Sequence, residues 1–509
     1  MSRHAHEPQV GGKGSHRLVV AAATAALLLG TSSAAVAQNS GRASEPPRPS
    51  AASPSAASPH VTGPVTGGNG AVVLQATAFD LNSVGYTQSE FLLSGNATAY
   101  APGAALGPDG RWSVAPASTA PYTSRIVVNR PKNPARFNGT VIVEWLNVSA
   151  GLDVAPDWIV AHNELIREGF AWVGVSAQAI GVAATKAADP VRYAHLSHPG
   201  DSYSYDVFSQ AGRAVRDSSA TVLAGLRPRA VLAEGESQSA FRLTTYINAI
   251  QPLDHVYGGF LVHSRGGFSA ALSQAPQADV PTPPVVTIRP DLGVPVLTVE
   301  TETDVIALGY LSARQADSHT FRLWELAGTA HADDYIANLG SVDDGDGSAG
   351  LQELNSMLDP PNGTPGFSCA IPINTGQMHY VMDAAQYALN RWVTAGVAPT
   401  KAPRLQVNTS GSAFVLDTNG NAKGGVRTPA VDAPVATLSG LGQSGASFCF
   451  LFGTTTPFDA TKLAALYPTH RQFVARWAAA TASGVASGFI RPVDAAELIR
   501  AAVGSPVGR

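Results

Sequence analysis

The middle of the chain alternates between short apolar runs and longer segments with helical periodicity. Apolar, β-branched runs predict strands, and apolar residues spaced three and four apart predict amphipathic helices. The predicted strands are residues 140–145, 171–175, 230–233, 259–263, 294–299 and 320–326, and the predicted helices are residues 158–168, 205–216, 240–250 and 378–395. Such alternation produces right-handed βαβ crossovers, so we expect the α/β class with a mostly parallel sheet flanked by helices.

The pattern changes on both sides of this region. Residues 71–76 and 124–128 are short β-branched segments between turn-rich stretches, which predict an antiparallel N-terminal lead-in to the sheet. After about residue 400, Asp417 to Gly420 indicate a hairpin, and residues 461–480 and 495–502 are predicted helices. We interpret residues 69–509 as one domain, with a core at about 69–400 and a C-terminal extension at 401–509. The extension is either a cap or padding at the sheet edge.

The first 68 residues have the composition of a targeting segment followed by a linker. Basic residues precede an apolar run at 18–29, and Ala35 to Ala37 have the small-x-small form of a cleavage site. We expect residues 1–37 to be a signal peptide, cleaved after Ala37, for a secreted or periplasmic protein. The apolar run is too short to span a bilayer core of ~30 Å. Residues 38–68 are rich in Ser, Ala, Pro and Gly and predict a disordered linker.

Composition and charge exclude several classes of partner. The chain has 509 residues, of which 45% are hydrophobic and 14% charged, enough for a large packed core. The net charge is −4 without a basic run, so nucleic acid is not an expected partner. No segment after the signal peptide is long and apolar enough to span a membrane.

Cysteine usage and acidic clusters indicate a disulfide and no metal. Export implies an oxidising compartment, where Cys369 and Cys449, the only two cysteines, are expected to pair; two buried thiols are the alternative. Neither cysteine has a metal-like neighbourhood. The acidic segment from Asp343 to Gly347 lacks the glycine and glutamate that an EF-hand loop requires, so we interpret it as a solvated loop. No metal or organic cofactor is expected.

A serine with nucleophile spacing follows one of the predicted strands. Gly235-Glu236-Ser237-Gln238-Ser239 has small residues two positions before and after the serine, as a sharp strand-to-helix turn requires. The pattern alone is weak, because six serines satisfy it when any small residue is accepted at the last position. Only Ser237 clearly follows a buried strand and opens a helix. Ser269 is the second candidate, and a serine that only caps a helix is the structural alternative.

An acid and a base follow this serine in the chain order that accompanies a nucleophile elbow of this kind. A serine hydroxyl needs a base to remove its proton and an acid to orient that base. His331 lies in the loop after the predicted strand at 320–326, with His379 as its main rival. The acid is expected just past the strand at 294–299, where Asp304 has the more usual spacing and Glu302 lies closer to the strand end.

The oxyanion of an acyl-transfer intermediate needs two hydrogen-bond donors. The backbone N–H after the nucleophile, at Gln238, is the first expected donor. The second is expected in the loop after the first parallel strand, between Asn147 and Ala150, with Asn147 and Val148 as the first choices.

Five motifs in order carry a resemblance to a known family. Residues 143–148, 172–178, 198–203, 235–240 and 327–333 together resemble the bacterial alpha/beta hydrolase domain family over about residues 70–500. The resemblance implies an α/β-hydrolase fold and a serine esterase-like hydrolase. Ser237 and His331 stand at the matching motif positions. The choice between Glu302 and Asp304 stays open, and so does the substrate.

The leading hypothesis is a hydrolase of carboxylic esters, small or polymeric, that acts through an acyl-serine intermediate. One alternative on the same scaffold is an acyltransferase or a depolymerase of polymer esters. A second alternative, from another class, is a secreted binding protein built on an inactive hydrolase fold. Because fold does not define substrate, the acyl and alcohol groups and the oligomeric state stay open.

Overall fold

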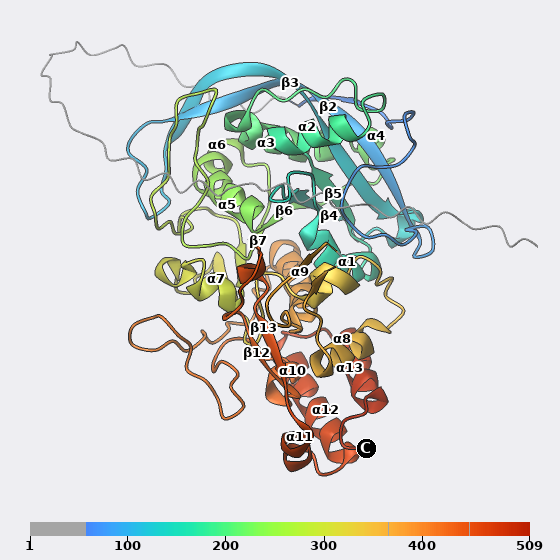
Figure 1. Ribbon diagram of the computed structural model, residues 1–509. Helices are drawn as coiled ribbons and strands as arrows, with labels where there is room; N and C mark the ends of the chain where they lie inside the picture. Colours follow the sequence, from blue (N-terminus) through green and yellow to red (C-terminus); the bar gives the residue numbers. More distant parts are fainter. Residues whose placement is uncertain (1–57, 365, 447) are drawn as a thin grey trace, which may run out of the picture.

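The computed structural model describes residues 58–364, 366–446 and 448–509 of the chain (Figure 1). Its main element is a nine-stranded sheet in the order β1-β2-β3-β5-β4-β6-β7-β8-β9. The strands are β1 (His60–Thr62), β2 (Tyr86–Pro102), β3 (Val114–Pro131), β4 (Thr140–Trp145), β5 (Ala171–Val175), β6 (Ala230–Glu236), β7 (Phe260–His263), β8 (Val296–Glu300) and β9 (Phe321–Glu325). The pairs from β1 to β3 and the β3–β5 pair are antiparallel, and the other pairs are parallel. This topology confirms the predicted α/β sheet with its antiparallel lead-in.

Helices cover both faces of the parallel strands. The α-helices up to residue 395 are α1 (Pro156–Arg167), α2 (Ala179–Ala188), α3 (Ser204–Asp217), α4 (Ser219–Val222), α5 (Gln238–Thr245), α6 (Gln251–Asp254), α7 (Glu302–Ile306), α8 (Ala349–Leu358) and α9 (Met378–Ala395). Trp158 of α1 and Met382 of α9 join the core on one face, and Phe208 of α3 and Leu243 of α5 join the core on the other. Because both faces are covered, β4, β5 and β6 are buried along their whole length. This burial explains their continuous apolar pattern in the sequence.

The lead-in and the linker differ from their predictions. Residues 71–76 form no strand and contain one bridge, between Gln75 and Val154. The antiparallel lead-in consists of the long strands β2 and β3; β3 contains the predicted segment 124–128, whereas β2 was not predicted because its small and polar residues weaken the strand pattern. The predicted linker ends too late, because His60–Thr62 pairs with β2 through backbone hydrogen bonds, which need little apolar content. The predicted signal peptide at residues 1–37 and the linker up to residue 57 lie outside the described residues.

The C-terminal extension lies at the β9 edge of the sheet, at the opposite end of the molecule from β2 and β3 (Figure 1). Val426 forms a parallel bridge with Leu326 just after β9. The remaining elements are α10 (Pro429–Asp432), the hairpin β12 (Ala436–Ser439) and β13 (Thr454–Pro457), α11 (Ala460–Leu466), α12 (His470–Ser487) and α13 (Pro492–Gly504). These elements share a small core with α8. Val426 therefore extends the pairing at the β9 edge by one bridge.

The helix predicted at residues 461–480 is divided into α11 and α12. Pro468 lies between them, and proline lacks an N–H and disfavours a helical conformation in the residue before it. None of the helices in the described residues combines the length and the hydropathy that a membrane span requires.

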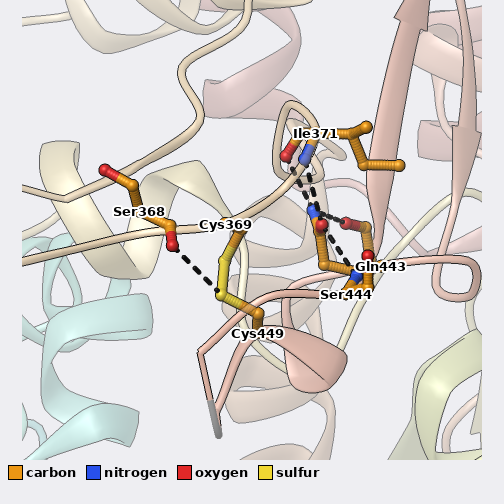
Figure 2. The surroundings of a disulfide bond; sticks show 7 residues. Ser368, Cys369, Ile371, Gln443, Ser444 and Cys449 are labelled. Carbon is orange, nitrogen blue, oxygen red and sulfur yellow. Dashed lines mark hydrogen bonds between the residues drawn. A yellow bond between two sulfur atoms is a disulfide. The ribbon is translucent and has the colours of Figure 1, made fainter.

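Cys369 and Cys449 form a disulfide that joins segments 80 residues apart (Figure 2). Cys369 follows the short hairpin of β10 (Gly363–Thr364) and β11 (Phe367–Ser368). Next to the disulfide, Ala370 N–H donates to Ser444 O (2.9 Å), and the Gln443 amide donates to Ile371 O (2.8 Å). The pairing expected from the sequence is therefore present. It fastens the segment before β13 to the chain that precedes α9.

Candidate active site

The candidate site lies at the carboxyl edge of the parallel strands. Ser237 follows β6, Asp304 lies in α7 just after β8, and His331 follows β9. Because parallel strands end on the same edge of a sheet, residues far apart in the sequence converge there. The loops after β6, β8 and β9 thus bring these three side chains together.

Ser237 occupies a sharp turn between β6 and α5. Its backbone has φ 56° and ψ −121°, a conformation that a non-glycine residue rarely adopts. A Cβ atom at Gly235 would lie 3.2 Å from the backbone carbonyl of Ser239, so this close approach favours glycine. The Ser239 hydroxyl accepts from Glu236 N–H (3.1 Å) and donates to Glu236 O (2.7 Å). A serine at this position, where glycine is more usual, therefore braces the turn.

His331 is hydrogen-bonded at both ring nitrogens. The Ser237 hydroxyl lies 2.7 Å from Nε2, and Nδ1 lies 2.6 Å from Asp304 Oδ1. The second carboxylate oxygen of Asp304 accepts from the N–H and the hydroxyl of Thr301, at 2.7 Å each, which fixes the carboxylate at the start of α7. Of the two acids that the sequence allowed, Asp304 is the one in contact with the histidine.

The charges around His331 raise its pKa. The ring is buried, and burial by itself lowers the pKa of an imidazole. The negative charge and the hydrogen bond of Asp304, together with the charge of Glu236, outweigh this effect, so the pKa of His331 lies above its usual value. The imidazolium form of His331 is thus stabilised.

Glu302 makes a different set of contacts. Its carboxylate accepts from Gly328 N–H (2.6 Å) in the loop before His331 and from Gly440 N–H (2.9 Å) in the C-terminal extension. Burial raises the pKa of Glu302 to about 7, against the effect of these two hydrogen bonds. Glu302 therefore ties the histidine loop to the extension.

The rival serine and histidine lie elsewhere. Ser269 follows β7, and its backbone carbonyl accepts from the Thr282 hydroxyl (2.7 Å). His379 begins α9 and stacks on the ring of Tyr335, with a centroid distance of 3.8 Å. In the described part of the chain, neither Ser269 nor His379 forms a hydrogen bond with Ser237 or His331.

The expected oxyanion donors differ in whether their backbone N–H groups already have an acceptor. Gln238 N–H lies in the first turn of α5, where helix N–H groups have no partner within the helix. Asn147 N–H donates to Val154 O (2.9 Å), so this backbone group is not available as a donor. Val148 N–H has no acceptor among the described residues, which leaves Val148 as the better of the two first choices.

Sequence reasoning missed Glu236, the residue just before Ser237. Its buried carboxylate lies 3.3 Å from His331 Nε2 and accepts from the Asn147 side-chain amide (3.1 Å). The elbow pattern places no constraint on this position, so the only available signal was an acidic residue between Gly235 and Ser237. Within the described residues, no group of three or more His, Cys, Asp or Glu side chains is arranged to hold a metal ion.

The fold and the convergence of a serine, a histidine and an acid at the carboxyl edge define the class of α/β hydrolases. The family described as "Alpha/beta hydrolase domain" matches residues 61–500, and the chain therefore belongs to that family. A search among curated proteins finds no match.

Several solved structures are similar to this chain at low identity. A lidless α/β serine hydrolase from Xanthomonas campestris is 13% identical, with 46% of this chain and 86% of that chain covered and a TM-score of 0.26. A carboxylesterase from Lactobacillus plantarum WCFS1 is 11% identical, with 42% and 75% covered and a TM-score of 0.25. An α/β serine hydrolase homologue from Coxiella burnetii is 12% identical, with 41% and 84% covered and a TM-score of 0.26.

Proposed function

We propose that the protein is a serine hydrolase that cleaves carboxylic esters through an acyl-serine intermediate. One observation carries the proposal: Ser237 is hydrogen-bonded to His331 (2.7 Å), and His331 is hydrogen-bonded to Asp304 (2.6 Å). The three residues also follow the chain order of nucleophile, acid and histidine that is typical of the fold. The buried setting of His331 and Asp304 favours strong electrostatic interactions.

In the proposed mechanism, His331 removes the proton of Ser237 while Oγ attacks the ester carbonyl. Asp304 keeps Nδ1 protonated and stabilises the imidazolium. The N–H groups of Gln238 and Val148 are proposed to bind the oxyanion. Imidazolium Nε2–H then protonates the leaving alcohol, and a water molecule, activated by the same nitrogen, releases the acid and restores Ser237.

Replacement of the nucleophile tests this proposal directly. We expect Ser237→Ala to lower kcat on short-chain p-nitrophenyl esters on the order of 10⁶-fold and to abolish labelling by a fluorophosphonate. Ser269→Ala is the matched control and is expected to keep both properties. Wild-type turnover in Ser237→Ala would contradict the proposal. Failure of the wild type to react with any serine-directed probe or ester would favour the inactive binding protein instead.

Asp304 and Glu302, the two acids in α7, are expected to differ in their effects on kcat and on stability. Asp304→Asn leaves Nδ1 without a carboxylate partner, and we expect kcat to fall about 10⁴-fold. Glu302→Gln replaces one of the two carboxylate oxygens that accept from the buried N–H groups of Gly328 and Gly440. We therefore expect a loss of ~1–3 kcal/mol in the free energy of unfolding and a much smaller change in kcat. Steady-state kinetics and urea unfolding of both variants measure these effects. A reversed pattern would assign the triad acid to Glu302.

Exposed aromatic side chains on two segments that adjoin the site favour esters with large apolar groups, including polymer esters, as a second candidate substrate class. Phe268, after β7, is 41% exposed and stacks on Phe241 (centroids 4.5 Å apart), whose N–H donates to Ser237 O. Phe450 is 44% exposed, and its neighbour Leu451 accepts from Ala332 N–H (3.1 Å), next to His331. Phe268 is thus linked to the turn of Ser237 through Phe241, and Phe450 lies one residue from the backbone contact to the loop of His331. We propose that these two exposed rings are available to an apolar substrate.

Removal of these two rings tests the substrate class. We expect Phe268→Ser with Phe450→Ser to lower turnover of long-chain esters and solid aliphatic polyester about five-fold, which corresponds to ~1 kcal/mol of lost apolar contact. Turnover of p-nitrophenyl acetate is expected to stay within about two-fold. Val493→Ser is the matched control, because the Val493 side chain on α13 is 52% exposed. Equal loss on all esters would contradict a role in recognising large apolar groups.

We also propose that the protein is exported after removal of residues 1–37. The disulfide between Cys369 and Cys449 supports this proposal, because disulfides persist in oxidising compartments. The mature protein recovered outside the cytoplasm is expected to begin at Gln38, which N-terminal sequencing would show. An intact N-terminus on the exported protein would contradict the cleavage site.

A further inference from the structure

Glu236 occupies a position that the proposed mechanism does not use. Its carboxylate oxygens are divided between two partners, because Oε1 lies 3.3 Å from His331 Nε2 and Oε2 accepts from Asn147 Nδ2 (3.1 Å). The Asn147 amide also donates to Glu236 O (3.1 Å), so one side chain fixes both the backbone and the carboxylate of this residue. Glu236 is therefore held against the ring nitrogen that exchanges a proton with Ser237.

A second histidine lies beside Glu236 on the neighbouring strand. Glu236 of β6 and His263 of β7 are direct partners in the parallel register, so their side chains leave the same face of the sheet. His263 Nδ1 lies 2.7 Å from Asp157 Oδ1 on α1, and both side chains are fully buried. Glu236 thus has His331 in contact with its carboxylate and His263 at the paired position of the next strand, and each histidine has its own aspartate.

These neighbours have opposite effects on Glu236. Burial raises the pKa of Glu236 to about 7, against the charges of His331 and His263, which lower it. Asp157 and Asp304 raise it further. A carboxylate in this balance changes its charge near neutral pH, in the range where an imidazole also titrates.

We propose that Glu236 is a positioning residue that acts through His331 as a second carboxylate partner of the imidazole. Asp304 binds the ring at Nδ1, and ionised Glu236 stabilises the proton at Nε2. The inference rests on the proposed hydrolase function. It adds an electrostatic partner on the side of the ring where chemistry takes place.

The proton balance of the proposed step is simple. The Oγ–H bond of Ser237 breaks, the Oγ–carbonyl bond forms, and the proton moves to Nε2. The imidazolium then lies between the carboxylates of Asp304 and Glu236 until the same proton passes to the oxygen of the leaving alcohol. Glu236 keeps no proton from the cycle. Glu236 contributes by stabilising the charged ring of His331 and by orienting its Nε2–H group.

The pH profile separates this role from a structural one. A negative charge beside Nε2 favours the protonated ring, so its removal lowers the pKa of His331. In Glu236→Gln, neutral His331 therefore persists to lower pH. We expect the acidic limb of kcat/KM to move to lower pH by roughly one unit and kcat on the plateau to fall about ten-fold. Initial rates on p-nitrophenyl acetate between pH 4 and pH 9 measure both effects.

Glu234→Gln is the matched control, because Glu234 lies two residues earlier on the same face of β6. Burial raises the pKa of Glu234 well above its usual value, and its carboxylate accepts from the Gln386 side-chain amide rather than from His331 or Ser237. We expect this variant to keep the wild-type acidic limb. Glu236→Asp retains the charge at a greater distance, and we expect a smaller shift in the same direction.

The inference would be overturned if the acidic limb of kcat/KM in Glu236→Gln stays at the wild-type pH. This outcome counts when the variant still unfolds cooperatively and reacts with a fluorophosphonate. If Glu236→Gln does not fold, an unshifted limb in Glu236→Asp has the same consequence. The proposed function fails separately, when Ser237→Ala keeps its turnover. If Ser237→Ala is inactive and the acidic limb of Glu236→Gln is unshifted, the proposed function stands and only the role of Glu236 is wrong.

Discussion

The placement of one imidazole is the constraint on which the site depends. His331 must reach Ser237 with Nε2 while Nδ1 stays bound to Asp304, and the two contacts measure 2.7 Å and 2.6 Å. Three separate loops supply these residues, so the geometry requires that β6, β8 and β9 end on one edge. The parallel sheet provides this edge, and helices on both faces keep the strands in register.

Supporting contacts hold each loop in this arrangement. Ser239 braces the turn of the nucleophile, Thr301 fixes the carboxylate of Asp304, and Glu302 ties the histidine loop to the extension. Thr303 adds a further connection, because its hydroxyl accepts from His331 N–H (3.2 Å) and donates to Gly440 O (2.6 Å). The extension therefore contributes to the site by fixing the acid and histidine loops rather than by supplying a reacting group.

The elements that carry the site were the most predictable from sequence. Strands such as Thr140–Trp145 and Ala171–Val175 are buried on both faces, so their apolar runs match the structure residue by residue. Strand β2 was not predicted, because its mixture of small and polar residues lacks a regular alternation. The choice between Asp304 and Glu302 depends on which carboxylate turns toward the ring, and spacing alone does not determine that. Glu236 was missed because its role arises from contacts with Asn147 and His331, which are distant in the sequence.

The central claim is that Ser237 reacts while His331, held by Asp304, manages its proton. A crystal structure of the protein inhibited by an alkyl phosphonate ester tests this claim most directly. The account predicts a phosphorus–oxygen bond to Ser237 Oγ, a phosphoryl oxygen within hydrogen-bond distance of Gln238 N–H, and the His331 ring still bound to Asp304. An adduct on any other residue, or a ring of His331 turned away from both Asp304 and the adduct, would contradict it.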